Sequence, residues 1–585
     1  MTAPGLFGPL LTKDGVTFRL WAPAAQSVNV VTGQTFAMKN TDGWFSAHVP
    51  DASAGTRYQF RIDDNLLIPD PASRYQPDDV HGPSEVIDHR YSWRCTDWKG
   101  RPWHEASFLE MHVGTFTQSG TFRSAIDRLD HIAALGLTAI ELMPVADFPG
   151  RWNWGYDGVL LYAPDSAYGR PEDLKALIDA AHERGLMVFL DVVYNHFGPE
   201  GNYLGRLAPS FFTDTQTPWG SAIDYRVPEV RAFAVENAIS WVRDYRFDGL
   251  RLDAVHAIVN RGTPDILTDL SRAVGEVARE TGRHIHLVLE NDDNTVSLLD
   301  PAEEPPNGHY RAQWNDDYHH AWHVHLTGEK LDYYKDYIDP APRIARAFAE
   351  GFIYQGEPSA HRNGQLRGDP SRLLSPLAFV NFLQNHDQIG NRAFGERLAS
   401  LASPSRIEAA LILLLLSPSP PLLFMGDEWG SARPFPFFCD FKGELAEAVR
   451  KGRKAEFAEA YADLGHDVPD PLAQETVRAA MLDWDTARDG AGARRLAFLR
   501  ALLKARRDHI VPLLPDIRPG LAKASFEKGI FSARWIAGER TLRILANFNG
   551  ADLPTSPQAI DHDIFSERRA NDDPPWCVSV ATGAA

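Results

Sequence analysis

Four predicted strands in the middle of the chain each end in a carboxylate, and these residues are Asp191, Asp253, Glu290 and Asp387. A helix N-cap or a solvated loop would explain any one of them. Four at the ends of separate strands, with arginine and histidine nearby, instead favour a shared site. Glycoside hydrolysis needs such carboxylates, because one must be an ionised nucleophile and another a protonated acid. The pattern therefore predicts a glycoside hydrolase.

The position of Arg251 indicates how the acids divide these roles. Arg251 stands two residues before Asp253 and, because side chains alternate along a strand, points to the same side. A neighbouring positive charge lowers the pKa of a carboxyl, so we expect Asp253 to be the nucleophile. Glu290 follows an apolar strand, where burial beside other acids raises the pKa, as a general acid requires. We expect Asp387 to bind sugar hydroxyls and to favour a distorted ring.

Histidine and aromatic residues near the strand ends are suited to sugar binding. His196 and His386 are suitable donors to hydroxyls, and Trp152, Trp154 and Tyr156 follow the second predicted strand. The face of a pyranose ring is apolar enough to stack on an aromatic side chain. We expect Tyr156 to contact the substrate, whereas the two tryptophans fit a packing role equally well.

Alternating strand and helix patterns predict the scaffold that positions these residues. Short apolar runs alternate with helical periodicity, with strands at 108–111, 139–142, 186–190, 249–252, 285–289, 379–383 and 421–425 and helices at 122–135, 171–184, 229–245, 264–281 and 404–416. Repeated strand–helix units over about 400 residues favour a closed (β/α)8 TIM barrel in an α/β fold. In such a barrel the carboxyl ends of all strands converge on one face, which brings the four acids together.

The flanking regions have a different pattern. Residues 1–90 alternate apolar and polar side chains between turn residues, which predicts an N-terminal β-sandwich. We expect a linker at 91–104, with linker-like composition already from 69 to 89, and the barrel at 105–515. A charged, alanine-rich stretch at 440–490 predicts a helical insertion, and 516–585 predicts a small C-terminal β-domain.

Composition excludes several function classes. The 585 residues contain 59 basic and 78 acidic side chains, a net charge of −19. Such a chain repels phosphate backbones and anionic lipid, so we expect no nucleic-acid or membrane partner. The longest apolar run, 409–416, is too short to cross a bilayer. With three cysteines and no visible secretory signal, we expect no disulfide framework and a cytoplasmic location.

Four segments of the barrel resemble the conserved regions of the α-amylase family of glycoside hydrolases: 191–196, 249–256, 287–291 and 382–387. The resemblance implies a retaining mechanism with Asp253 as nucleophile, Glu290 as acid/base and Asp387 as transition-state stabiliser. It also implies that Asp191, His196, Arg251 and His386 line the subsite of the attacked sugar. We further expect Tyr156, His256 and Asn385 to bind the substrate. Ala254-Val255-His256 departs from the Lys-His pair usual in plain α-amylases, which counts against simple starch cleavage.

Longer segments at 154–159, 313–320, 382–397, 423–430 and 434–440 look most like one group in that family, the maltooligosyltrehalose trehalohydrolases. This resemblance implies hydrolysis of the α-1,4 bond next to a terminal trehalose, with trehalose and maltooligosyltrehalose as ligands. It also implies a functional link to maltooligosyltrehalose synthase. Trp314, Asn315, Asp316 and His319 are then candidates for holding trehalose, although a helix start would also explain their types.

Two alternative functions remain open. A glycogen branching enzyme shares the first half-reaction, and the segments at 313–320 and 382–397 argue against it. A catalytically silent carbohydrate-binding protein would be expected to lack at least one of the three catalytic carboxylates. Some relatives bind calcium near the position of Asn195, but calcium needs six or more oxygens and no such set is visible. We therefore expect no metal and no cofactor.

Overall fold

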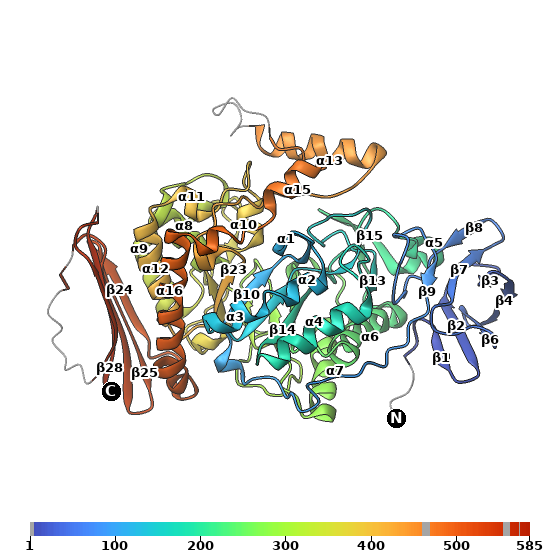
Figure 1. Ribbon diagram of the computed structural model, residues 1–585, viewed down its shortest axis with the longest axis horizontal. Coiled ribbons are helices and arrows are strands. Elements are labelled where there is room, and N and C mark those ends of the chain that lie inside the picture. Colours follow the sequence, from blue (N-terminus) through green and yellow to red (C-terminus); the bar gives the residue numbers. More distant parts are fainter. Residues whose placement is uncertain (1–4, 459–467, 551, 554–561, 573) are drawn as a thin grey trace.

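The structure, a computed structural model, describes residues 5–458, 468–550, 552–553, 562–572 and 574–585. Three bodies follow one another along the long axis of the molecule (Figure 1). A β-sandwich lies at one end, a barrel surrounded by helices lies in the middle, and a C-terminal sheet lies at the other end.

The sandwich consists of two antiparallel sheets whose inner faces carry the apolar side chains. The strand orders are β1-β2-β6-β5 and β4-β3-β7-β8, with β9 paired to β7. On β2 the alternating residues Val16, Phe18 and Leu20 are buried in the core between the sheets. The strands are β1 (Leu10–Thr12), β2 (Gly15–Trp21), β3 (Val28–Val31), β4 (Thr35–Ala37), β5 (Lys39–Thr41), β6 (Trp44–Val49), β7 (Arg57–Ile62), β8 (Leu66–Ile68) and β9 (Ser84–Glu85).

The stretch from 69 to 89 is packed into the structure, so its prediction as linker is wrong. Asp70, Gln76 and Ser84 are buried, and Ser84–Glu85 pairs with β7. The Oε1 atom of Gln76 accepts hydrogen bonds from Ser84 at 2.6 Å and from Ser73 at 2.8 Å. Its polar residues resemble a loop by composition, but they satisfy one another in the interior.

The barrel is closed by eight parallel strands in the order β10-β11-β14-β17-β18-β19-β22-β23. Their residues are buried on both faces, as parallel strands covered by helices require. The sixth strand has only three residues, so it leaves a weak signal in the sequence. The strands are β10 (Phe108–Met111), β11 (Ala139–Leu142), β14 (Met187–Val192), β17 (Gly249–Leu252), β18 (His286–Leu289), β19 (Ala312–Trp314), β22 (Phe379–Phe382) and β23 (Pro421–Phe424).

Helices cover the outside of the barrel, with one departure from the expected pattern. The helix expected over 122–135 is divided in two, since α2 ends at Ile126 and α3 begins at Leu129. In the expected insertion, 459–467 lie outside the described residues. The main helices are α2 (Phe122–Ile126), α3 (Leu129–Leu135), α4 (Pro171–Glu183), α6 (Pro228–Asp244), α7 (Ile266–Thr281), α8 (Asp316–Thr327), α9 (Pro340–Glu350), α10 (His386–Gly390), α12 (Pro404–Leu416), α13 (Gly443–Glu456), α15 (Gln474–Ala480) and α16 (Gly490–Ala505).

The C-terminal sheet packs against the helices at one side of the barrel. Its strand order is β24-β25-β26-β28-β27. Trp535 on β25 donates its indole N–H to the carbonyl of Phe348 on α9 at 3.2 Å. The strands are β24 (Lys523–Glu527), β25 (Ile530–Ala537), β26 (Arg540–Asn547), β27 (His562–Arg569) and β28 (Trp576–Ala584).

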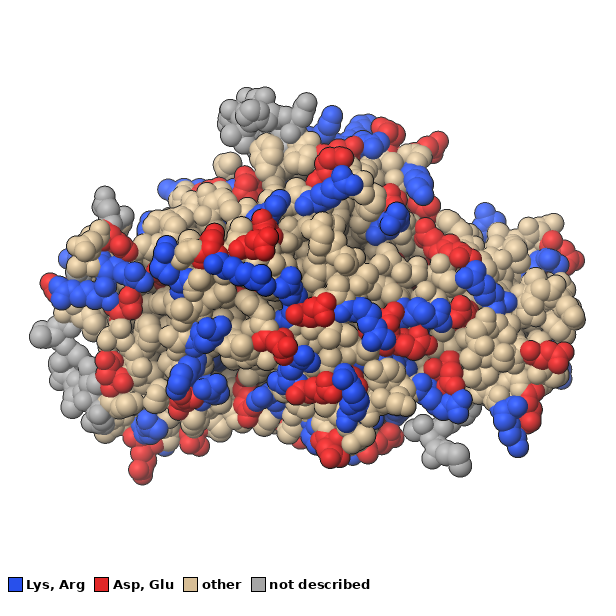
Figure 2. Space-filling model, viewed as in Figure 1, with Lys and Arg blue, Asp and Glu red and all other residues tan. Residues whose placement is uncertain are grey.

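Two surface properties bear on possible partners. Acidic and basic side chains are interspersed over the face in Figure 2, without a broad basic area. In the described part of the chain, no helix has both the length and the hydrophobicity that a bilayer-spanning segment needs.

Candidate active site

A cavity of about 450 Å³ opens where the carboxyl ends of the barrel strands converge. It brings together nine of the residues predicted from the sequence: Tyr156, His196, Arg251, Asp253, His256, Glu290, Asp316, His386 and Asp387. These residues come from different strands and loops, and the closed barrel places them around one space.

Arg251 is the positive centre of the site. Its Nη1 donates to both carboxylate oxygens of Asp191, at 2.9 and 2.8 Å, and to Oδ1 of Asp253 at 2.7 Å. Its Nη2 lies 3.9 Å from Oε2 of Glu290. The guanidinium also lies over the ring of Trp314, 4.2 Å from the centroid. One buried cation therefore balances several acids that would otherwise repel one another.

Asp253 is held as an anion. Burial by itself favours its neutral form, but Arg251, His196 and Asn195 outweigh burial, so the pKa of Asp253 lies below its ordinary value. The side-chain amide of Asn195 donates to both the backbone carbonyl and Oδ2 of Asp253, each at 2.9 Å. A carboxylate fixed in this way is suited to nucleophilic attack.

Glu290 has the opposite electrostatic environment. Burial, together with the charges of Asp253, Asp316 and Asp387, raises its pKa well above the ordinary value, although Arg251 acts against this. The backbone N–H of Ala254 donates to Oε2 of Glu290 at 2.6 Å. Two carboxyl groups with opposite pKa shifts in one cavity are typical of a nucleophile and acid pair.

Asp387 is the second residue of the short helix α10 and faces the cavity. Asn385 precedes it, is buried, and accepts the backbone N–H of Asp387 with its Oδ1 at 2.9 Å. Asn391 donates to Oδ1 of Asp387 at 2.9 Å. Burial raises the pKa of Asp387. Asn385 therefore caps the helix from behind the cavity wall and does not line the cavity, in contrast to its expected contact with the substrate.

The partner of His386 is Glu110, which sequence reasoning missed. Glu110 lies on β10, is 1% exposed, and accepts the backbone N–H of His386 at 3.2 Å. Its other oxygen contacts Nδ1 of His386. Burial lowers the pKa of this imidazole, but Glu110 reverses the direction, so the net pKa of His386 is raised. The sequence did contain a signal for this contact, because Glu110 is the one charged residue in the otherwise apolar strand β10.

Aromatic rings define one side of the cavity. Tyr156 donates its hydroxyl to Oδ2 of Asp191 at 2.6 Å and stacks on His386 with centroids 5.1 Å apart. Asp191 itself lies behind Arg251 and does not line the cavity. Trp219 stacks on His196 at 5.2 Å and is 46% exposed. These rings offer apolar faces of the kind on which sugars stack.

Three of the four candidates for holding trehalose lie in the barrel core. Trp314, Asn315 and His319 are at most 1% exposed, and none lines the cavity. Asn315 donates to Asn381 at 2.9 Å, and Nδ1 of His319 bonds to the carbonyl of Leu383 at 2.6 Å. A direct bond from these side chains to a sugar would require them to leave the core, so the expected contact does not fit their positions. Asp316, in contrast, faces the cavity.

The wall beyond Asp316 was not anticipated from the sequence. We call it the far wall, and it consists of Asp292, Asp316, His320, Tyr333, Asp336, Tyr337, Ser359, His361, Arg362 and Arg367. Most of these residues come from the long connection between the sixth and seventh barrel strands, whose loops the sequence patterns did not place. Burial beside Asp292 and Asp387 raises the pKa of Asp316 to about 7.

A metal site does not emerge from the geometry. Within the described residues, no three His, Cys, Asp or Glu side chains are grouped so that they could hold a metal ion. Asn195, the position considered for calcium, uses its amide nitrogen on Asp253 and turns its oxygen to His196.

Two family models match the chain. The model "Alpha amylase, catalytic domain" matches residues 96–210. The model "Carbohydrate-binding module 48 (Isoamylase N-terminal domain)" matches residues 6–75, within the sandwich. Both matches agree with the observed arrangement of sandwich and barrel.

Relatives match over most of the length. A Deinococcus radiodurans protein named malto-oligosyltrehalose trehalohydrolase is 42% identical, and the match covers 91% of this chain and 88% of that protein. One of the same name from Saccharolobus solfataricus is 39% identical, with 86% and 87% covered. A crystal structure from Salmonella typhimurium, described as an alpha amylase, has 45% identity and a TM-score of 0.93 over 99% of this chain and all of that one. A branching enzyme from Streptomyces coelicolor, in contrast, matches only 43% of this chain and 38% of its own, at 34% identity.

Proposed function

The chain belongs to the family of malto-oligosyltrehalose trehalohydrolases, and from this we propose that it cleaves the α-1,4 bond next to the terminal trehalose of maltooligosyltrehalose. The products are trehalose and a maltooligosaccharide. The substrate is assigned from the relatives. The observation that supports glycosidase chemistry is the cavity in which Arg251 pairs with an ionised Asp253 beside a protonated Glu290.

In the first half-reaction we assign the attack to Asp253. One of its oxygens bonds to the anomeric carbon while the bond from that carbon to the leaving oxygen breaks. Glu290 donates its proton to the leaving oxygen, which departs as the hydroxyl of trehalose. The raised pKa of Glu290 supports this role because the proton is retained until the substrate is bound.

In the second half-reaction Glu290, now ionised, takes a proton from water, and the resulting oxygen attacks the glycosyl ester. The bond to Asp253 breaks and the carboxylate is regenerated. Two inversions give retention of configuration. We assign Asp387 and His386 to the hydroxyls of the attacked sugar, where hydrogen bonds that strengthen in the transition state lower the barrier.

We place trehalose against the far wall. Glu290 is the assigned proton donor, so the leaving group must lie beside it. Asp292, two residues after Glu290, and Asp316, whose charge acts on Glu290, both line the cavity. Trehalose presents only hydroxyls and ring oxygens there, which suits carboxylate acceptors and arginine donors. The substrate must come from a reaction that converts the reducing end of a maltooligosaccharide into trehalose, which supports a functional link to the corresponding synthase.

Product analysis tests this proposal. The enzyme is incubated separately with maltotriosyl-trehalose, maltopentaose and amylose, and the products are separated by chromatography. We expect rapid release of trehalose and little action on the uncapped chains. Formation of α-1,6 branches in amylose without release of trehalose would overturn the proposal and favour the branching alternative. The branching enzyme from Streptomyces coelicolor matches less than half of this chain.

A further inference from the structure

We propose that Asp317 is a positioning residue that holds Arg367 and thereby fixes Asp292 as a hydroxyl acceptor for the leaving sugar. This inference rests on the function proposed above and adds to it a device for discriminating capped from uncapped chains. The Asp317 carboxylate does not line the cavity and lies behind the residues that do.

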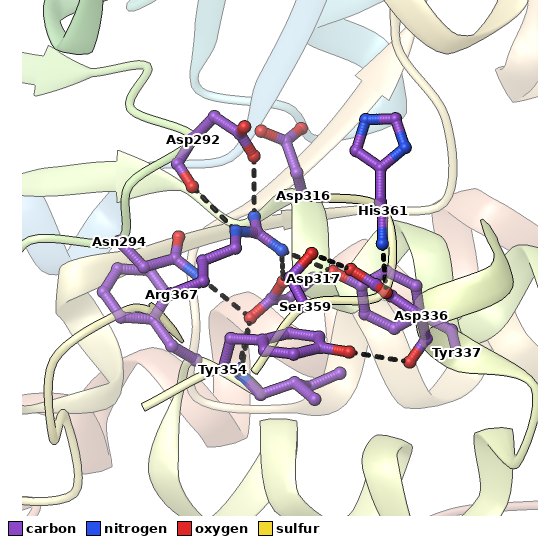
Figure 3. Close-up of polar contacts among 12 residues, drawn as sticks. Asp292, Asn294, Asp316, Asp317, Asp336, Tyr337, Tyr354, Ser359, His361 and Arg367 are labelled. Atoms are coloured by element: carbon purple, nitrogen blue, oxygen red, sulfur yellow. Dashed lines mark hydrogen bonds and ion pairs between the residues drawn. The ribbon is translucent and has the colours of Figure 1, made fainter. Parts of the chain in front are cut away.

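Asp317 is the centre of a buried polar network (Figure 3). It is the second residue of α8, is 0% exposed, and does not line the cavity. Its neighbour Asp316 faces the cavity, so two consecutive acids point to opposite sides. Five donors surround the carboxylate: Nη1 of Arg367 at 2.9 Å, the hydroxyl of Tyr337 at 2.5 Å, Nδ2 of Asn294 at 3.0 Å, and the backbone N–H groups of Ile353 at 2.6 Å and Tyr354 at 2.9 Å.

These donors come from separate segments of the far wall. Asn294 follows the fifth barrel strand, Tyr337 lies in the connection before α9, and Ile353 and Tyr354 follow that helix. Asp317 is bonded to all of these segments, and Nη1 of Arg367 also donates to the Tyr337 hydroxyl at 2.8 Å, so the carboxylate is the shared acceptor that holds them against α8. An amide in its place would direct an N–H group at one or more of the donors, so even an isosteric substitution would disrupt the network.

Arg367 connects the buried Asp317 to Asp292 at the cavity surface. Its Nη1 is bound to Asp317, while its Nη2 lies 2.8 Å from Oδ1 of Asp292. Its Nε donates to the backbone carbonyl of Asp292, also at 2.8 Å. The Arg367 side chain is only 4% exposed, so these contacts are shielded from water. The planar guanidinium therefore spans two carboxylates at a fixed separation, as a lysine cannot.

Asp292 is the exposed end of this chain of contacts. It lies two residues after Glu290, and 44% of its side chain is accessible at the cavity. Burial acts to raise its pKa, but Arg367 and Arg362 outweigh burial and lower it. Asp292 is thus an anion beside the proton donor, with lone pairs left for sugar hydroxyls.

The direct test is a double-mutant cycle with Asp317→Asn, Asp292→Asn and the double variant. The maltotriosyl-trehalose reaction is measured for kcat and KM, with maltopentaose as the uncapped reference. We expect each single variant to raise KM for the capped substrate about tenfold with a smaller change in kcat, and to lower the preference for it. We expect the double variant to match the single ones. If Asp317 acts only through the contact between Asp292 and the leaving sugar, its substitution adds nothing once Asp292 has been replaced.

Asp248→Asn is the matched control. Asp248 is also 0% exposed and accepts bonds from Trp98, His182 and the backbone of Val188, but it precedes β17 at the opposite end of the barrel. We expect it to lower the melting temperature without changing KM or the preference. If Asp317→Asn does not fold, Arg367→Lys is measured in its place. Lysine keeps the positive charge but cannot contact Asp317 and Asp292 at the same time.

Three outcomes would overturn the inference. These are an unchanged preference in Asp317→Asn, an equal change in preference in the Asp248→Asn control, and losses in the double variant that multiply. A wild type that releases no trehalose would instead overturn the proposed function. The cycle on whichever oligosaccharide is cleaved then still shows whether Asp317 acts through Asp292.

Discussion

His386 donates its backbone N–H to Oε2 of Glu110 at 3.2 Å, and its ring Nδ1 contacts the other oxygen of the same carboxylate. This pair joins the first barrel strand to the end of the seventh, across 276 residues of sequence. It fixes the orientation of the imidazole, which lines the cavity. In the reaction proposed above, this ring is assigned to a sugar hydroxyl, to which it donates when it is protonated.

Glu110→Gln should therefore impair catalysis although Glu110 does not line the cavity. Loss of a hydrogen bond to a charged group costs about 1.5–3 kcal/mol, which corresponds to a decrease in kcat/KM of about 10- to 100-fold. The pKa of His386 should fall, because its raised value depends on the carboxylate. Steady-state kinetics and histidine titration by NMR check this. An unchanged kcat/KM would contradict the role of the pair.

Removing the proposed acid, as Glu290→Gln, should lower kcat by about 10²–10⁴-fold while the protein still binds maltooligosaccharides. Titration calorimetry measures the binding, and rapid-quench assays measure the turnover. Glu141→Gln is the control, since Glu141 on β11 is also buried and its pKa is raised well above the ordinary value by burial. Because burial favours the uncharged form of Glu141, an amide there preserves its size and hydrogen-bonding shape, so activity should hardly change. Comparable turnover in both variants would argue against Glu290 as the acid.

The charge of Asp316 should show in the pH profile. With Glu290 as the proposed acid, activity should fall at high pH when Glu290 loses its proton, and Asp316 helps to raise the pKa of Glu290. Asp316→Asn should therefore move the alkaline limb of kcat/KM to lower pH. The acid limb depends on the lowered pKa of Asp253 and should stay in place. Because the pKa of Asp316 is about 7, the effect should emerge mainly above that pH. A shift of the alkaline limb to higher pH would refute this coupling.

Stability should depend strongly on Arg506, which lies far from the cavity. Arg506 is 2% exposed and donates to backbone carbonyls in the last turn of α12 and just after it, including Leu415 at 3.0 Å, Ser417 at 2.6 Å and Ser419 at 2.9 Å. Arg506→Met leaves these carbonyls without a donor, so we expect a loss of about 2–3 kcal/mol in the free energy of unfolding. Calorimetry checks this, and kcat/KM of the folded variant should equal that of the wild type. A melting temperature equal to that of the wild type would contradict it.

Sequence reasoning was accurate where local pattern and topology act together. The ends of strands β14, β17 and β18 were placed within a residue or two, because buried parallel strands leave clear apolar runs. Once a closed barrel was inferred, its strand ends had to converge, so Asp253, Glu290 and Asp387 could be grouped without coordinates. The expectation of a helix over 122–135 was wrong in detail, since periodicity does not reveal the break after Ile126.

The sequence by itself determined that Asp253, Glu290 and Asp387 share the cavity, because that depends on strand order and on which residue ends each strand. Only the tertiary structure decided which side of α8 faces the cavity: Asp316 does, while Asp317 and His319 face the core. Helical periodicity identifies a buried stripe but not what lies against it. The far wall and the contact from Glu110 to His386 likewise depend on residues that are distant in sequence and that no local pattern connects.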